Sequence, residues 1–152
     1  MSASESKDGV NLRSMRVCIY GRTDLQQVPA RFISSLAFKI LELMPAVIVT
    51  GGSKYSRKES QEEANPISTD VAALEGATRY ANQQGVPLED CYEAWIPEPD
   101  LDTREDIKVV RMSEEDGITV RVMPGRTPLG RRLAMVAGVD MVVTISGKKH
   151  TE

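Results

Sequence analysis

The sequence predicts an α/β protein with an open, mainly parallel, Rossmann-like sheet flanked by helices. Three apolar runs, residues 17–20, 46–50 and 141–145, are each followed closely by glycine and then by a predicted helix start or a charged stretch. Continuous β-branched runs of this kind are typical of buried parallel strands. Strands that alternate with helices along the chain favour a parallel sheet covered on both faces.

The first half of the chain predicts two strands and two helices. A strand at 16–20 leads to a helix at 28–43, with Pro29 in its first turn, and a second strand follows at 46–50. The polar stretch 53–66 is predicted to be a long loop, and a second helix at 69–84 begins at a Ser68 or Thr69 cap and ends at Gly85. Residues at helical spacing predict the buried helix faces: Phe32, Ile33, Leu36, Ala37, Ile40 and Leu43, then Val71, Leu74, Ala77 and Tyr80.

The second half predicts the remaining strands and a third helix. Residues 91–96 form a third strand, 97–106 an acidic loop, and 107–112 with 118–123 a hairpin turning at 115–117. A helix then begins with Thr127 as its cap and Pro128 as its first residue, and it ends at Gly138 before a last strand at 139–145. Its expected buried residues are Leu129, Leu133 and Val136.

The ends of the sequence predict a tail and an incomplete pattern. Residues 1–14 are polar and are predicted to be a disordered tail, and residues 15–152 form one domain. Strand–helix alternation calls for a final helix after residue 145, and the sequence stops at Glu152 without one. We therefore expect either a longer parent protein or a partner that covers this side of the sheet.

Composition excludes several classes of function. The net charge of -3 argues against a dominant nucleic-acid surface, and no apolar run approaches the roughly 18 residues of a membrane span. Two cysteines and one histidine give neither a disulfide framework nor a zinc site. The expected setting is the cytoplasm, with no metal and no cofactor.

A repeated tripeptide predicts phosphate binding. Gly21-Arg22-Thr23 and Gly125-Arg126-Thr127 each lead into a predicted helix. Glycine allows close backbone approach, arginine can donate two hydrogen bonds to a phosphate, and threonine can cap the helix. The alternative is a pair of ordinary capped turns. Arg131 and Arg132 follow the second tripeptide, and one of them is expected to point toward the strand ends.

Two further glycine turns extend this prediction. Gly51, Gly52 and Ser53 follow the second strand and are expected to cradle a phosphate, with a plain tight turn as the alternative. Gly147, Lys148 and Thr151 follow the last strand, where the lysine could neutralise phosphate and the alternative is a charged chain end. The dinucleotide G-x-G-x-x-G, the P-loop and the G-x-S-x-G elbow are absent from the sequence, which disfavours those enzyme classes.

Several of these motifs, in this order, resemble the SLOG superfamily. That group includes LOG-type cytokinin-activating phosphoribohydrolases, DprA/Smf proteins and the N-terminal ligand-sensing domain of TRPM channels. The similar segments are residues 17–21, 47–52 with 68–77, and 131–140 with the segment that follows. The chain departs from the Pro-Gly-Gly-x-Gly-Thr-x-x-Glu loop of the LOG enzymes, because residues 145–152 keep only Gly147, Thr151 and Glu152.

The resemblance implies a binding module for a nucleotide or an ADP-ribose-like signal, as the sensor of a longer bacterial stress or antiphage protein, and a homo-oligomer. The rival hypothesis is a nucleotide N-glycosidase, for which Glu152 and Glu75 are the candidate catalytic carboxylates. A third hypothesis is an interaction domain without a ligand.

Overall fold

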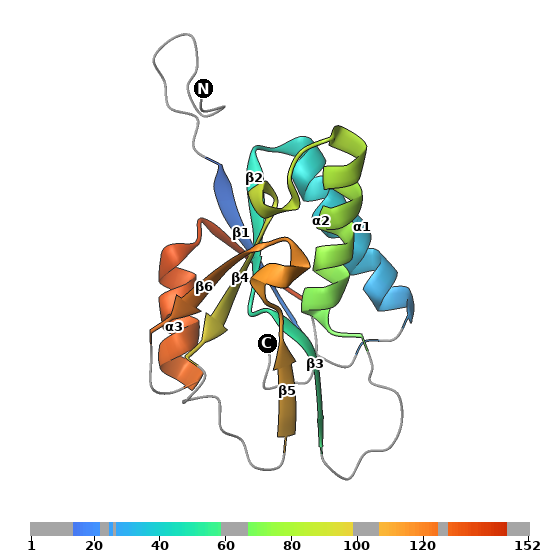
Figure 1. Cartoon of the computed structure of the whole chain (residues 1–152). Helices are drawn as coiled ribbons and strands as arrows, with labels where there is room; N and C mark the ends of the chain where they lie inside the picture. Colours follow the sequence, from blue (N-terminus) through green and yellow to red (C-terminus); the bar gives the residue numbers. More distant parts are fainter. Residues whose placement is uncertain are drawn as a thin grey trace, which may run out of the picture.

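Five apolar runs form one parallel sheet at the centre of the protein (Figure 1). The computed structural model describes residues 14–21, 25, 27–58, 67–98, 107–124 and 128–145. Within these ranges the sheet has the order β6-β4-β2-β1-β7, and every neighbouring pair is parallel. The strands are β1 (Met15–Tyr20), β2 (Ala46–Thr50), β4 (Tyr92–Pro97), β6 (Thr119–Met123) and β7 (Met141–Thr144). The predicted open α/β Rossmann-like fold is therefore confirmed.

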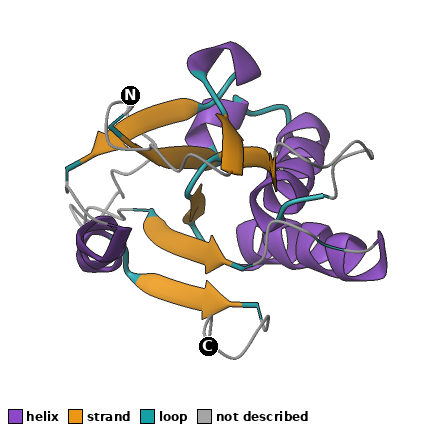
Figure 2. Cartoon of the chain, turned by 90° about the horizontal axis from the view of Figure 1, so that it is seen from below, coloured by secondary structure: helices purple, strands orange, loops and turns teal. Residues whose placement is uncertain are grey.

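Helices cover both faces of this sheet (Figure 2). Helices α1 (Gln27–Leu43) and α2 (Thr69–Gln84) pack on one face over a core that includes Val17, Ile19 and Ile48. Helix α3 (Pro128–Gly138) packs on the other face, where Met135 contacts the smaller cluster of Cys18, Val49 and Trp95. Side chains alternate between the faces of a strand, so neighbouring residues of β1 serve the two layers.

The ends of α2 follow the predicted capping chemistry. Ser68 has an extended backbone, and its hydroxyl accepts a hydrogen bond from Val71 N at 3.0 Å. Gly85 ends the helix in the left-handed conformation, with φ of 68°. Both boundaries were predictable because each depends on the chemistry of a single local residue.

Helices α1 and α2 pack unusually closely at Gly76. A Cβ atom on Gly76 would lie 2.1 Å from the carbonyl oxygen of Ser34 and 3.0 Å from Ala37 Cβ. The other α2 residues at this contact are also small, namely Ala72, Ala73 and Ala77. The two helices therefore meet backbone to backbone at Gly76 and Ser34, with no room for a larger residue.

The predicted helix faces are wrong in part. Phe32 and Leu43 of α1 are 62% and 71% exposed, and Leu133 and Val136 of α3 are 61% and 54% exposed. In α1 the predicted Ile33, Ala37 and Ile40 are buried, together with Ala30, Ser34 and Leu41. The buried face of α1 is therefore turned away from Phe32 and Leu43, and Ser34 and Ala37 on it lie against Gly76 of α2. The side chain of Leu129 lies outside the described residues.

An antiparallel ribbon replaces the predicted loop and hairpin. Part of the 53–66 stretch forms β3 (Ser53–Lys58), which pairs with β5 (Ile107–Arg111), and both extend beyond the central strands (Figure 1). The predicted hairpin between 107–112 and 118–123 is wrong, because β6 pairs in parallel with β4. Short 3-10 helices at Leu88–Asp90 and Glu114–Asp116 complete the described elements. The predicted tail, apart from Ser14, and any final helix lie outside the described residues.

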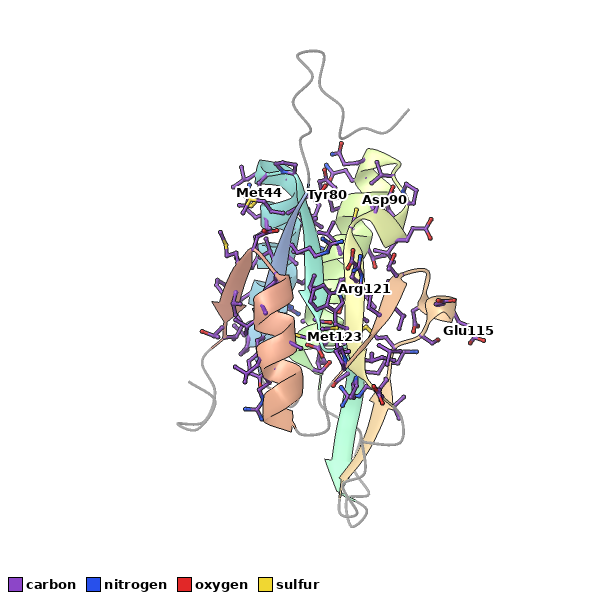
Figure 3. The ribbon with its side chains drawn as sticks, turned by 90° about the vertical axis from the view of Figure 1, so that its left-hand side faces the viewer. Met44, Tyr80, Asp90, Glu115, Arg121 and Met123 are labelled. Carbon is purple, nitrogen blue, oxygen red and sulfur yellow. The ribbon has the colours of Figure 1, made fainter. Side chains whose placement is uncertain are left out.

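A buried carboxylate ties the α3 face together. Glu93 on β4 accepts hydrogen bonds from Trp95 Nε1 at 2.9 Å and Arg16 Nε at 3.4 Å, and Arg121 Nε lies 3.0 Å from the same oxygen. The Arg121 guanidinium also lies over the Trp95 ring, 5.8 Å from its centroid. Figure 3 looks onto this side, where Arg121 and Met123 of β6 lie beside α3. Two cations and an indole N–H compensate the buried charge.

The close approach at Gly76 makes a direct prediction. Gly76→Ala places a methyl group against the Ser34 carbonyl, so the two helices must separate, and we expect a loss of about 2–3 kcal/mol in the free energy of unfolding. Urea denaturation followed by circular dichroism measures this loss. Ser35→Ala, at an exposed position of α1, is the control and should change stability by less than about 0.5 kcal/mol. A Gly76→Ala protein as stable as wild type would contradict the packing described here.

Candidate functional site

The strand order places the reversal point of the sheet between β1 and β7. From β1 the chain adds β2, β4 and β6 in one direction, and then returns to the opposite side of β1 with β7. In open α/β sheets, ligands bind outside the carboxyl ends of the strands at such a reversal. The candidate site therefore lies where β1 ends at Tyr20 and β7 ends at Thr144. The backbone of Ile145 still pairs there, donating to Tyr20 O at 2.8 Å.

Gly21 brings three elements together at this point. A Cβ atom on Gly21 would lie 2.6 Å from Thr69 Oγ1 and 3.0 Å from Ile145 Cβ. The end of β1, the first residue of α2 and the residue after β7 therefore meet at one glycine. We call this side of the protein the carboxyl edge: Gly21, Ile145, the turn at residues 50–53 and the first turn of α2.

The two glycines after β2 have different roles. Gly52 has φ of +72°, and a Cβ atom there would lie within 3.0 Å of Ile96 Cγ2 and Ala94 Cβ, so Gly52 is required for the turn and for packing on β4. At Gly51, by contrast, a Cβ atom would meet Asp70 Oδ2 at 3.7 Å, an ordinary van der Waals distance, and no other described atom within 4 Å apart from its chain neighbours. Gly51 is partly exposed at the carboxyl edge.

Reciprocal hydrogen bonds fix the turn to the first turn of α2. Asp70 Oδ2 accepts from Ser53 N at 2.8 Å, and the Ser68 hydroxyl donates to Ser53 O at 2.7 Å. The same Ser68 oxygen caps α2 through Val71 N. The backbone at Ser53 therefore has both of its polar groups paired with α2 side chains.

A buried chain of hydroxyl groups connects the turn to β4. Gly52 N donates to Thr50 Oγ1 at 3.1 Å, the Thr50 and Tyr92 hydroxyls are hydrogen-bonded to one another, and the Tyr92 hydroxyl donates to Asp70 O at 3.1 Å. These bonds can all be made in one direction, each hydroxyl accepting one hydrogen and donating its own. Burial raises the pKa of Tyr92 well above its ordinary value, so its hydroxyl stays protonated.

Arg111 supplies a cation at the same turn. It is the last residue of β5 and the register partner of Ser53. Its Nη1 atom donates to Gly51 O at 3.1 Å and to Ser53 Oγ at 2.9 Å. The ribbon thereby places a guanidinium beside Gly51 and Ser53.

The Asp70 carboxyl is the titratable group of the site. Burial raises its pKa from 3.8 to about 6, although the Ser53 N–H and the positive charge of Arg111 both oppose the shift. A carboxyl of this kind is mainly ionised at neutral pH but holds a proton easily. The thiols differ: burial raises the pKa of Cys18 to about 12 and also raises that of Cys91, so both stay protonated and unreactive.

The structure brings only some of the predicted site residues together. Gly21, Gly51, Gly52 and Ser53 lie at the carboxyl edge, and their role in ligand binding stays a prediction. Arg132 is exposed on α3, and Glu75 is exposed on α2. The side chain of Arg131 lies outside the described part of the structure, so its predicted role is untested. The same holds for eight whole residues: Arg22, Thr23, Arg126, Thr127, Gly147, Lys148, Thr151 and Glu152.

The sequence alone did not predict that Thr69, Asp70 and Arg111 belong to the carboxyl edge. Thr69 and Asp70 were predicted only as part of a helix start, although an acidic residue two positions after the Ser68 cap was visible in the sequence. Arg111 carried no local signal, because it reaches the turn only through pairing of β5 with β3. The pairing partner of an isolated polar strand cannot be predicted from periodicity alone.

The described residues contain no group of three or more His, Cys, Asp or Glu side chains that could hold a metal ion. In the same ranges, no helix is both long and apolar enough to cross a membrane. Comparison of the sequence with protein-family models gives no match, and comparison with curated proteins gives none either. Fold and edge together define an open α/β protein of the Rossmann-like type with a polar carboxyl edge.

The pKa of Asp70 makes stability depend on pH. The folded state holds the proton up to about pH 6, whereas the unfolded chain releases it near pH 3.8, so the free energy of unfolding falls between these values and then levels off. Asp70→Asn removes this dependence but keeps an acceptor for Ser53 N. We expect the stability difference between wild type and Asp70→Asn to change by on the order of 1–3 kcal/mol from pH 4 to pH 6.5.

Denaturant titrations at a series of pH values measure this difference. Glu75→Gln, at an exposed position of the same helix, is the control variant. Parallel profiles for wild type and Asp70→Asn would contradict the burial of the Asp70 carboxyl.

Proposed function

We propose that the carboxyl edge binds a phosphorylated, nucleotide-derived ligand and that the domain acts as its sensor. The observation that carries the proposal is the meeting of Gly21, Thr69 and Ile145 at the reversal point of the sheet. Gly21 packs the end of β1 against the start of α2 and the residue after β7. These three elements therefore meet at the sheet edge where open α/β proteins bind their ligands.

The charges of the edge support a position for the phosphate. The N-terminus of α2 is already complemented by the Ser68 cap and by the negative charge of Asp70, so a phosphate is disfavoured there. In the sequence, Arg22 and Thr23 follow Gly21 directly. The phosphate is therefore proposed to bind at this segment, with Arg126 and Lys148 as further cations from the predictions made on the sequence.

The sensor role follows from the SLOG resemblance, and so does the suggestion of a longer bacterial stress or antiphage protein. Binding is proposed to bias assembly of subunits. Exposed apolar residues on two helices, Val28, Phe32 and Leu43 of α1 and Leu133 and Val136 of α3, support the expectation of a homo-oligomer.

Hydrolysis of an N-glycosidic bond is the second candidate function. Asp70 favours it, because a carboxyl with a pKa of about 6 beside the proposed ligand position suits acid–base catalysis near neutral pH. Of the two carboxylates predicted for this role, Glu75 is exposed away from the edge, and Glu152 lies outside the described residues.

A ligand panel tests binding. Thermal-shift and calorimetric measurements with AMP, cyclic AMP and ADP-ribose should show that at least one of them binds and stabilises the fold, by about 2.7 kcal/mol at 100 times its Kd. Gly51→Ala should fold normally, because its methyl group meets only Asp70 at 3.7 Å, yet weaken that binding at least about tenfold by filling the space beside Asp70. Gln84→Ala, at the far end of α2, is the control.

The same incubations separate sensing from hydrolysis. Chromatography should find no free base if the domain only senses its ligand, whereas release of base that is lost in Asp70→Asn would establish the N-glycosidase. No binding across the panel, or unchanged binding in Gly51→Ala, would overturn the proposed site.

A further inference from the structure

Among the described residues, the Asp70 carboxyl accepts a hydrogen bond at only one of its two oxygen atoms. Its Oδ2 atom accepts from Ser53 N at 2.8 Å, and no described donor lies within hydrogen-bonding distance of Oδ1. The carboxyl group also borders Gly51, because Asp70 Oδ2 lies 3.7 Å from the position of a Cβ atom there. A carboxylate with one oxygen unpaired among the described residues thus lies beside a partly exposed glycine, at the edge where the ligand is proposed to bind.

The chemistry of the Asp70 carboxylate determines which kind of ligand group can bind beside it. An ionised carboxylate only accepts hydrogen bonds, and it repels another anion. Its partner must therefore be a donor, such as a hydroxyl group, while the phosphate of the same ligand stays on the Gly21 side. A hydrogen bond from a hydroxyl to a charged acceptor is stronger than one between neutral groups.

The geometry joins these two positions. Thr69 lies against Gly21, and the next residue, Asp70, lies against Gly51. Successive Cα atoms are only about 3.8 Å apart, so a ligand with its phosphate at Gly21 carries its adjoining sugar to Asp70. Gly21 and Gly51 end neighbouring parallel strands, which are about 4.8 Å apart. A sugar phosphate spans this distance.

We propose that Asp70 accepts hydrogen bonds from the ribose hydroxyls of the ligand, so that the site selects ribonucleotides over their deoxy counterparts. This inference rests on the proposed function, because it assumes that a nucleotide binds at the carboxyl edge. Asp70 is then a specificity-determining residue, held in position by Ser53 N.

Isothermal titration calorimetry on the whole chain tests the inference with AMP, 2′-deoxy-AMP and 3′-deoxy-AMP as probes. Wild type should bind AMP at least about tenfold more tightly than the weaker deoxy probe, since a site built to bond a hydroxyl rejects the analogue that lacks it. Asp70→Asn keeps an acceptor for Ser53 N but loses the charge. It should bind AMP more weakly, and the ratio between AMP and the deoxy probes should shrink toward one.

Two results would overturn the inference, and they are distinguishable. If AMP and both deoxy probes bind wild type equally well, or if Asp70→Asn keeps the full ratio, the selection of ribose by Asp70 is wrong while nucleotide binding stands. If none of the probes binds wild type and ADP-ribose does not bind either, the proposed function fails and the inference fails with it. Circular dichroism of Asp70→Asn separates loss of folding from loss of selectivity.

Discussion

The polar turn after β2 is the constraint on which the carboxyl edge depends. The turn takes the backbone of residues 50–53 into a largely buried position, where its N–H and carbonyl groups need partners within the protein. Asp70 and Ser68 supply them from α2, Arg111 from β5 and Thr50 from within the turn. Four elements are therefore fixed relative to one another by a few hydrogen bonds, and the ribbon of β3 and β5 is attached to the sheet at the same place.

This arrangement gives the edge two chemically different halves. On the side of β1, Gly21 lies against Thr69 and Ile145, so three elements meet there. On the side of β2, the Asp70 carboxylate borders the space next to Gly51. A ligand that carries an anionic group at one end and hydroxyl groups beside it is complementary to both halves, which is the chemistry of a nucleotide. The raised pKa of Asp70 follows from the burial that lets the carboxyl reach Ser53 N.

Much of the fold could be predicted from the sequence because it depends on local chemistry. The strands at β1, β2 and β7 are continuous apolar runs, and the ends of α2 are set by Ser68 and Gly85. Helix orientation could not be predicted in the same way. Phe32 and Leu43 have the right spacing for a core face, but the side of α1 that is buried is the one on which Ser34 and Ala37 lie against Gly76 of α2.

The site residues likewise fall into those with a local signal in the sequence and those placed only by contacts between distant segments. Gly21, Gly51 and Gly52 were predictable, since glycine just after a strand marks a close approach of the backbone. Arg111 was not, because its role depends on strand pairing between segments more than 50 residues apart. Asp70 stood beside a recognisable cap, but only the contacts with Ser53 and Gly51 show that its carboxyl belongs to the edge.

The most direct test of this account is a titration of 15N-labelled protein with ADP-ribose, followed through the backbone amide signals. If the carboxyl edge binds the ligand, the largest chemical-shift changes should fall on Gly21, Gly51, Gly52 and Ile145. Changes confined to the opposite end of the sheet, near Gly85 and Cys91, or to the exposed face of α3, would contradict it.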